Sequence, residues 1–394
     1  MRFLSANYLF PIHQQPIKDG VLVIDEEGKI IDLIDPFIAS VSDVLPVEKF
    51  EGILCPGLIN AHCHLELSHL RGKLMQKKKL THFISEVIEK RNAEEGIILD
   101  AMKVADSEMY KNGIVAVGDI SNTSVSKNIK VNSKIYYHTF IELFDITEER
   151  AADVFRRGKE LKSEFELSGL KATLVPHAPY SVTKKLLKLI IDEAEKGNEI
   201  LCIHNQETAT ENEMFEKGTG ALFEKLLSSN SAYKEWKASG KSSLSNVLEF
   251  LYTNQYMQMV HNTYTRFEDV MASKNFKNLY WCFCIKANLF IENSVPDINL
   301  FIVENCKCTI GTDSLASNNS LSILDEIMVI QNQFSNISMH DLLTMATLNG
   351  AACLKVEHKL GSFEKGKTPG VNWIKNLSQS NLIFTEKSQL SRIC

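Results

Sequence analysis

Short apolar runs alternate with longer amphipathic segments from about residue 52 onward. Eight of these runs cover residues 53–60, 114–119, 135–142, 172–177, 199–204, 257–261, 279–284 and 308–313. The segments between them, such as 84–91 and 184–196, repeat apolar residues with the period of a helix. Eight strand–helix alternations predict an α/β protein built as a (β/α)8 TIM-type barrel.

The two ends of the chain have a different pattern. Residues 21–25 and 30–34 read as two strands joined by a turn at 26–29, and residues 339–354 read as a helix followed by a β-rich tail. Chain ends tend to lie close together. We therefore expect a small discontinuous β-sandwich domain formed by residues 1–54 and 357–394, beside a catalytic barrel formed by residues 55–356.

One connection is unusually long. About 50 residues separate the fifth run from the sixth, whereas loops between strands and helices usually take about 2–6 residues. Long segments on the carboxyl-terminal face of a barrel commonly form a lid or a pocket wall. We expect residues 208–255 to be helical and to line the mouth of the pocket, the alternative being a helical insertion with no role at the site.

Composition narrows the function classes. Of 394 residues, 44% are hydrophobic and 23% charged, which is ordinary for a globular protein, and the net charge is −6. This balance lacks the basic footprint of a nucleic-acid binder, and no run reaches the ~18 apolar residues of a membrane span. The amino-terminal residues lack a signal-peptide pattern, and nine cysteines without a regular framework indicate reduced thiols. We expect a cytoplasmic protein that binds neither nucleic acid nor membranes.

Histidines stand where several runs end. His62 and His64 follow the first run at a spacing of two, which puts both on one face of a strand and lets them share a metal ion. His204 ends the fifth run and is a candidate third ligand. Barrel active sites lie at the carboxyl ends of the strands, so these residues should meet.

Further candidates occupy equivalent positions. Glu207 lies three residues beyond His204, where a carboxylate that does not bind the metal can act as a general acid and base. Asp313 ends the eighth run and offers a carboxylate to the metal or to its water. His261 and His177 end the sixth and fourth runs, and His261 suits proton transfer near neutral pH. The alternative for His204 and Glu207 is a packed core histidine and a solvated helix acid.

These motifs together resemble the amidohydrolase superfamily, and most of all its mononuclear deaminase and chlorohydrolase branch. The resemblance spans about residues 50–370 and rests on residues 56–64, His177-Ala-Pro-Tyr-Ser181, His204-x-x-Glu207-Thr208, His261-Asn262, residues 311–319 and residues 361–366. It implies metal ligands His62, His64, His204 and Asp313, catalytic residues Glu207, His261 and Asp313, and His177 as a substrate contact.

The fourth run carries no lysine at its end, whereas binuclear members of this superfamily have a bridging lysine there. One divalent transition metal is therefore expected, with zinc first and iron or manganese as alternatives, because three histidines and an aspartate suit several metals. Residues 367–373 also depart from the family's usual carboxyl-terminal pattern, which concerns only the small β domain.

A narrower resemblance covers about thirty residues. His64-Leu-Glu66-Leu-Ser68, with Phe83, Val87, Ile88 and Arg91 after it, resembles the aminodeoxyfutalosine deaminases. This similarity implies an aminopurine nucleoside-like substrate that Glu66 and Arg91 would contact. The alternative is that Glu66 packs internally and Arg91 lies on a helix surface.

The sequence thus predicts a metal-dependent hydrolase that deaminates an amino-heterocycle, such as 6-aminodeoxyfutalosine or an adenosine analogue. Two alternatives stay open: a hydrolase of another C–N or C–Cl bond at the same centre (an amidohydrolase or chlorohydrolase), and a catalytically inactive interaction protein. The expected partner is a small-molecule substrate. The family resemblance also implies that the protein can form a homodimer.

Overall fold

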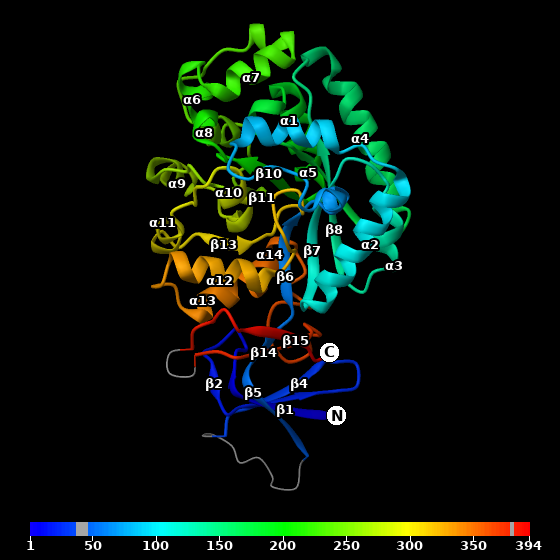
Figure 1. Ribbon diagram of the computed structural model, residues 1–394, viewed down its shortest axis with the longest axis vertical. Helices are drawn as coiled ribbons and strands as arrows, with labels where there is room; N and C mark the ends of the chain where they lie inside the picture. Colours follow the sequence, from blue (N-terminus) through cyan, green and yellow to red (C-terminus); the bar gives the residue numbers. More distant parts are fainter. Residues whose placement is uncertain (37–45, 379–381) are drawn as a thin grey trace.

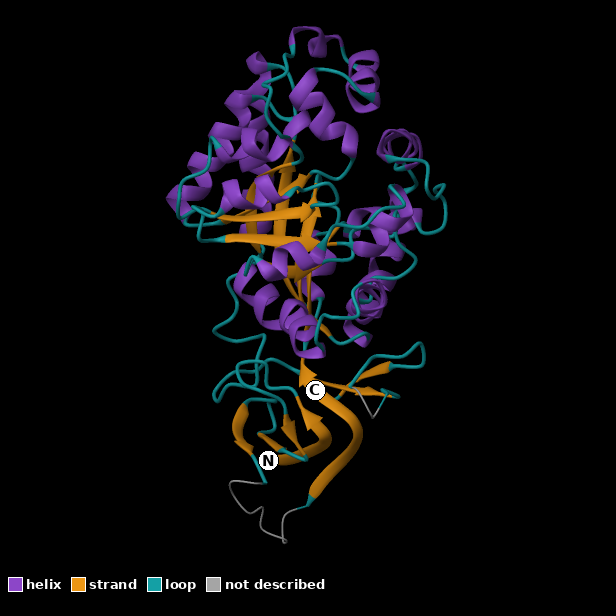
Figure 2. Cartoon of the chain, turned by 90° about the vertical axis from the view of Figure 1, so that its left-hand side faces the viewer, coloured by secondary structure: helices purple, strands orange, loops and turns teal. Residues whose placement is uncertain are grey.

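The computed structural model describes residues 1–36, 46–378 and 382–394. Both chain ends lie in a β-rich part, drawn at the bottom of Figure 1. The rest of the described chain contains two parallel sheets with helices around them. Figure 2 shows the same division from the side, with the strands of the larger part enclosed by helices. The α/β architecture predicted from the sequence is confirmed.

Strands from the two chain ends form one seven-stranded sheet. Its order is β15-β14-β5-β1-β3-β4, and β2 pairs with β1. The predicted hairpin is present as antiparallel β3 and β4. The strands are β1 (Arg2–Leu9), β2 (Ile17–Lys18), β3 (Val21–Ile24), β4 (Ile30–Ile34), β5 (Val47–Pro56), β14 (Val371–Lys375) and β15 (Gln389–Arg392).

The predicted run 53–60 is wrong as a single strand. Its first part ends β5 of the small sheet, and its second part begins β6 (Leu58–Cys63) of the larger region. Gly57 separates the two, and a Cβ atom there would lie 2.2 Å from Val115 Cγ1 and 2.6 Å from the Pro369 carbonyl oxygen. Only glycine fits this junction. The Pro56-Gly57 dipeptide is a turn signal inside the apolar run, and the single-strand prediction did not use it.

Eight parallel strands form two four-stranded sheets, in the orders β6-β7-β8-β9 and β10-β11-β12-β13. The sheets meet at both edges: His204 N–H donates to the His177 carbonyl at 2.9 Å, and Thr312 N–H donates to the His62 carbonyl at 3.0 Å. The further strands are β7 (Ile114–Ser121), β8 (Tyr136–Leu143), β9 (Lys171–Pro176), β10 (Ile200–Asn205), β11 (Tyr256–His261), β12 (Leu279–Phe283) and β13 (Lys307–Ile310).

Helices cover the outside of these sheets. The amphipathic pattern of 184–196 is α5 (Lys184–Gly197), whose predicted apolar face is buried and whose first turn is capped by the Thr183 hydroxyl. The other helices along these strands are α1 (Leu80–Lys90), α2 (Glu95–Lys111), α3 (Lys127–Asn132), α4 (Ala151–Glu166), α9 (Phe267–Ser273), α10 (Ile285–Ile291), α11 (Ile298–Val303) and α12 (Ile323–Gln333). Within the described ranges, none has the length and apolarity needed to cross a membrane.

Two predicted helical segments are confirmed. The long connection after β10 contains α6 (Ala209–Lys217), α7 (Ala221–Ser229), the 3-10 turn η4 (Ser231–Glu235) and α8 (Ser243–Leu248). The segment 339–354 contains α13 (Met339–Thr344), the π-helical turn η5 (Met345–Asn349) and α14 (Gly350–Cys353).

A fully buried ion pair joins several of these elements. Lys130 Nζ of α3 lies 2.7 Å from Asp119 Oδ2 of β7, and neither side chain is exposed. The same ammonium donates to the Ser121 and Thr139 hydroxyls at 2.9 and 3.1 Å. Asp119 Oδ1 accepts the Leu65 N–H at 2.7 Å, directly after His64. The pair therefore ties α3, β7 and β8 to the backbone beside the predicted metal ligands.

Lys130→Met should lower the free energy of unfolding by about 3–5 kcal/mol, because it leaves the Asp119 carboxylate buried without its cation. Chemical denaturation measures this loss. Lys127→Met, in the same helix but partly exposed, is the matched control and should change the value by less than about 1 kcal/mol. Equal effects of the two substitutions would contradict the role given to the buried pair.

Candidate active site

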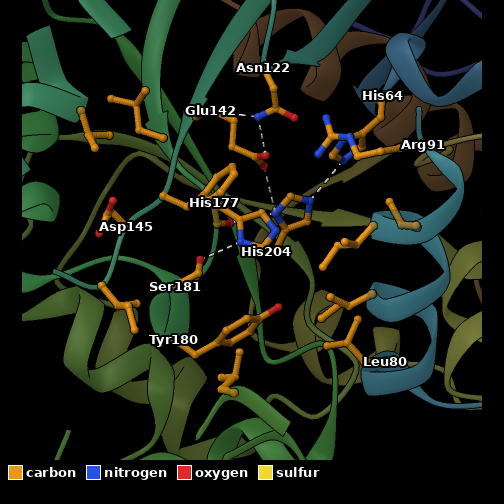
Figure 3. Close-up of a pocket in the computed structure, with 18 of the residues that line it drawn as sticks. His64, Leu80, Arg91, Asn122, Glu142, Asp145, His177, Tyr180, Ser181 and His204 are labelled. Atoms are coloured by element: carbon orange, nitrogen blue, oxygen red, sulfur yellow. Dashed lines mark hydrogen bonds and ion pairs between the residues drawn. The ribbon is translucent and has the colours of Figure 1, made fainter. Parts of the chain in front are cut away.

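Three imidazole nitrogens meet where the two parallel sheets join. His62 lies in β6, His64 directly follows it, and His204 lies in β10. His62 Nε2 is 3.0 Å from His64 Nε2, which is 3.2 Å from His204 Nε2. The side chains thus form a group able to hold a metal ion. Figure 3 shows His64 and His204 pointing toward each other.

Asp313 supplies a carboxylate to the same place. It lies three residues beyond β13, and its Oδ1 is 3.3 Å from His64 Nε2 and 3.9 Å from His62 Nε2. Its backbone has φ +55°, a left-handed conformation that costs energy for a residue other than glycine. Ser317 Oγ donates to Oδ2, which leaves Oδ1 facing the histidines.

This donor set fits a divalent transition metal. Nitrogens about 2.0–2.1 Å from a tetrahedral ion lie roughly 3.4 Å from each other, close to the observed separations. His204 Nδ1 donates to the His177 carbonyl at 2.8 Å, which leaves its Nε2 lone pair free. The pKa of His64 is lowered to about 4 and that of His204 to about 3, and burial is the largest cause in both cases. Both rings are therefore neutral near pH 7, as metal ligands must be.

Glu207 lies close by without joining this group. It is 6% exposed in the loop between β10 and α6, and Glu211 holds that loop by accepting the N–H groups of Gln206 and Glu207. Burial raises the pKa of Glu207 well above its usual value, and the carboxylates of Asp313 and Glu292 raise it further. A buried carboxyl that keeps its proton near neutral pH can act as a general acid.

His261 faces Glu207. Its Nε2 is 3.7 Å from Glu207 Oε1, and its Nδ1 is 2.9 Å from Asn288 Oδ1. The ring is therefore anchored at Nδ1 and presents Nε2 to the site. Its backbone has φ +73°, which makes His261 a second strained residue at a strand end.

The three predicted substrate contacts are placed differently. His177 and Arg91 line the cavity beside the histidines, and His177 Nδ1 is fixed 2.7 Å from Ser181 Oγ. Glu66 is instead turned toward the loop after β7, where its carboxylate accepts the N–H groups of Asn122 and Thr123 at 3.2 and 3.3 Å. Its role as a substrate contact stays a prediction.

A cavity of about 790 Å³ opens from the histidine group toward the surface. Its inner end is formed by His64, His204, Glu207, His261 and Asp313, and its outer walls are largely apolar. The long connection after β10 contributes Leu226, Ser229, Asn230 and Tyr233, which confirms that this segment lines the pocket. Facing them are α1 residues such as Leu80, Phe83, Ile84 and Val87.

Sequence reasoning missed several polar residues of this cavity, among them two that contact each other. Glu142, in β8, and Asn122, just after β7, both line it, and Asn122 Nδ2 donates to Glu142 Oε2 at 3.0 Å. Figure 3 shows the pair above His177 and His204. A signal existed, because run 135–142 ends in an acid just as other runs end in histidines.

The chain belongs to the amidohydrolase family, whose model matches residues 53–387. It is 26% identical over 389 residues to 5-methylthioadenosine/S-adenosylhomocysteine deaminase of Teredinibacter turnerae, covering 93% of this chain and 82% of that protein.

Solved structures agree on the fold. Helicobacter pylori aminofutalosine deaminase in complex with methylthio-coformycin matches with a TM-score of 0.80 and 25% identity over 98% of this chain and 94% of that one. An adenosine deaminase from Xanthomonas campestris with bound zinc matches with a TM-score of 0.74 and 20% identity over 96% and 85% of the two chains. The latter likeness concerns the fold alone.

The purified protein should contain close to one divalent transition metal per chain. His62→Ala and His204→Ala should each reduce that content severely, because each removes one of the converging nitrogens. Elemental analysis measures the ratio. His138→Gln is the matched control, since His138 is buried in β8 with its Nε2 on Thr173 Oγ1 and should keep the metal. Two metals per chain would contradict a mononuclear centre.

Proposed function

We propose that this protein is a metal-dependent hydrolytic deaminase that removes the exocyclic amine of an aminopurine nucleoside-like compound. The observation that carries the proposal is the pairing of a metal-suited group with a separate buried acid. Glu207 lines the same cavity as His64, His204 and Asp313, but no contact of its carboxylate with the three converging histidines is found in the described residues, whereas Asp313 Oδ1 is 3.3 Å from His64 Nε2. Burial raises the pKa of Glu207, which favours the protonated carboxyl. Deamination needs such an acid, because the ring nitrogen next to the reacting carbon must be protonated.

We propose His62, His64, His204 and Asp313 as the ligands of one divalent ion, with zinc first and iron or manganese as alternatives. When bound, such an ion supplies Lewis acidity, which lowers the pKa of a coordinated water from 15.7 to about 7. The convergence of the four side chains supports this assignment, as does the zinc in a protein of the same fold.

Glu207, His261 and Asp313 then move the protons. Glu207 donates a proton to the ring nitrogen beside the amine-bearing carbon, while Asp313 and His261 orient and deprotonate the attacking water. A C–O bond forms at that carbon, and the proton taken from water is passed through Glu207 to the amine. The C–N bond breaks, ammonia leaves, and the remaining proton of the new hydroxyl returns to Glu207 as the carbonyl forms. The separation of 3.7 Å between His261 Nε2 and Glu207 Oε1 is short enough for both to contact one small reacting group.

The cavity supports the substrate class. Its volume of about 790 Å³ and its apolar outer walls suit a molecule larger than a free heterocycle. His177 and Arg91 are the proposed substrate contacts among its polar lining, and Glu66 is kept as a third candidate. Relatives named for methylthioadenosine, adenosine and aminodeoxyfutalosine support adenosine analogues or 6-aminodeoxyfutalosine as the specific candidates.

An ammonia-release screen of metal-loaded protein tests this proposal. The panel contains adenosine, methylthioadenosine, adenosylhomocysteine, aminodeoxyfutalosine, guanine and cytosine. Ammonia from one or more of the nucleoside-like compounds is the expected result. Release of chloride from a chlorinated heterocycle, with no ammonia from any member of the panel, would instead indicate a chlorohydrolase.

We also propose the finer architecture. Contacts at both sheet edges favour closure of the eight parallel strands into one (β/α)8 barrel over residues 55–356. Pairing of strands from both chain ends favours a separate small domain from residues 1–54 and 357–394, folded as a β-sandwich. We also propose that the protein forms a homodimer, because the family resemblance implies one.

Glu207→Gln should lower kcat by about 10²–10⁴ or more, because the amide keeps the size of the side chain but cannot carry the proton. Metal content and melting temperature should stay near the wild-type values, since Glu207 is not among the proposed ligands. Glu216→Gln is the control, because Glu216 lies on neighbouring α6 and pairs at the surface with Arg266. Near-normal kcat in fully metal-loaded Glu207→Gln protein would refute the mechanism.

A further inference from the structure

Glu142 is a buried acid of the cavity that the proposed reaction leaves without a role. It stands near the end of β8, where its side chain is 5% exposed, and it lines the cavity next to the histidine group. In Figure 3 its carboxylate lies between Asn122 and the rings of His177 and His204. A carboxylate is costly to bury, so its contacts indicate what it serves.

Within the described residues, one of the two carboxylate oxygens has a hydrogen-bond donor and the other has none. Glu142 Oε2 accepts from Asn122 Nδ2 at 3.0 Å, and the Asn122 N–H is itself fixed on Glu66 at 3.2 Å. Glu142 Oε1 is buried and has no hydrogen-bond partner in the described part of the chain. A buried acceptor left in this state is unusual, and its position in a cavity points to a donor on the ligand.

The neighbouring histidine does not satisfy Oε1. His204 Nδ1 lies 3.7 Å from Glu142 Oε1, which is beyond hydrogen-bond distance. That nitrogen already donates to the His177 carbonyl at 2.8 Å. Glu142 also lies on the Nδ1 side of the ring, whereas the other histidines face Nε2. Oε1 is therefore near the Nδ1 side of the His204 ring and close to His177, where a part of the substrate outside the amino-heterocycle can reach it.

The surrounding charges favour a neutral donor. A divalent ion at the histidine group would lie on the other side of the His204 ring, and Arg91 lines the same cavity. Both would repel a cationic substrate group placed at Glu142. A hydroxyl has no charge and can donate to the free oxygen while its own oxygen accepts from a neighbour.

We propose that Glu142 binds a sugar hydroxyl of the substrate, and that Asn122 is the positioning residue that sets its rotamer. This inference rests on the proposed deaminase function and makes its substrate class narrower. The enzyme acts on ribonucleoside-like compounds whose hydroxyls Glu142 recognises, and discriminates against free bases and deoxynucleosides.

The test compares kcat/KM for adenosine, 2′-deoxyadenosine, 3′-deoxyadenosine and adenine. Wild-type protein should prefer adenosine over at least one of the deoxynucleosides by about 10- to 100-fold, the usual effect of a hydrogen bond to a charged group. Glu142→Gln should reduce this preference by about tenfold, because its amide is a weaker acceptor and can present N–H groups instead. Metal content should match the wild type, which separates loss of a hydroxyl contact from loss of a ligand.

Asp145→Asn is the matched control. Asp145 lines the same cavity, but its carboxylate already accepts the Thr147 N–H at 2.8 Å and lies 3.2 Å from Arg150 Nε. Its substitution should leave the ratio between adenosine and the deoxynucleosides unchanged.

Four results would overturn the inference. Equal rates of wild-type protein on adenosine and both deoxynucleosides would remove the need for a hydroxyl contact while leaving deaminase function intact. If Glu142→Gln kept the preference for adenosine over the deoxynucleosides, or if Asp145→Asn lost it, a residue other than Glu142 would bind the sugar hydroxyl. Loss of metal from Glu142→Gln would make Glu142 part of the metal centre. Failure of the wild-type protein to release ammonia from any aminopurine would overturn the proposed function together with this inference.

Discussion

The convergence of three imidazole nitrogens and one carboxylate oxygen is the constraint on which the rest of the site depends. The three Nε2 atoms lie 3.0 and 3.2 Å apart, which is close to the separation of nitrogens that share one tetrahedral metal ion. Their side chains come from β6 and β10 and from the residue after β6, so the two parallel sheets must meet in one register. The contacts between His62 and Thr312, and between His177 and His204, hold that register at the two edges.

The surroundings of the histidines, of Glu207 and of the outer cavity differ, and each suits a different role in the proposed reaction. The histidines are neutral because burial lowers their pKa, whereas burial raises the pKa of Glu207 and so favours its protonated form. The cavity lining is largely apolar and includes the buried acid Glu142, which suits it to the substrate class proposed above. Strained backbone at His261 and Asp313 indicates that the fold holds these side chains in place at some cost in stability.

Much of this arrangement could be predicted from the sequence because parallel strands covered on both faces read as continuous apolar runs. Seven of the eight runs correspond to one strand each, whereas the run 53–60 is divided between β5 and β6. The spacing of two between His62 and His64 agrees with their rings lying together, with their Nε2 atoms 3.0 Å apart. Pro56-Gly57 marks the break between β5 and β6, but the close approach of Val115 and Pro369, which requires glycine there, could not be predicted because both are distant in the sequence. The surroundings of Glu66 and Glu142 likewise depend on Asn122 from a neighbouring strand end, which no local pattern reveals.

The central claim is that water replaces an exocyclic amine at a purine carbon, and isotope labelling tests it most directly. Metal-loaded protein is incubated in ¹⁸O-water with the best nucleoside from the screen, and both products are quantified. The account predicts one ¹⁸O atom on the purine ring carbon for each ammonia released, with the sugar–base bond intact. Label on the sugar, or product formed without ammonia, would contradict deamination and show that a different bond is hydrolysed.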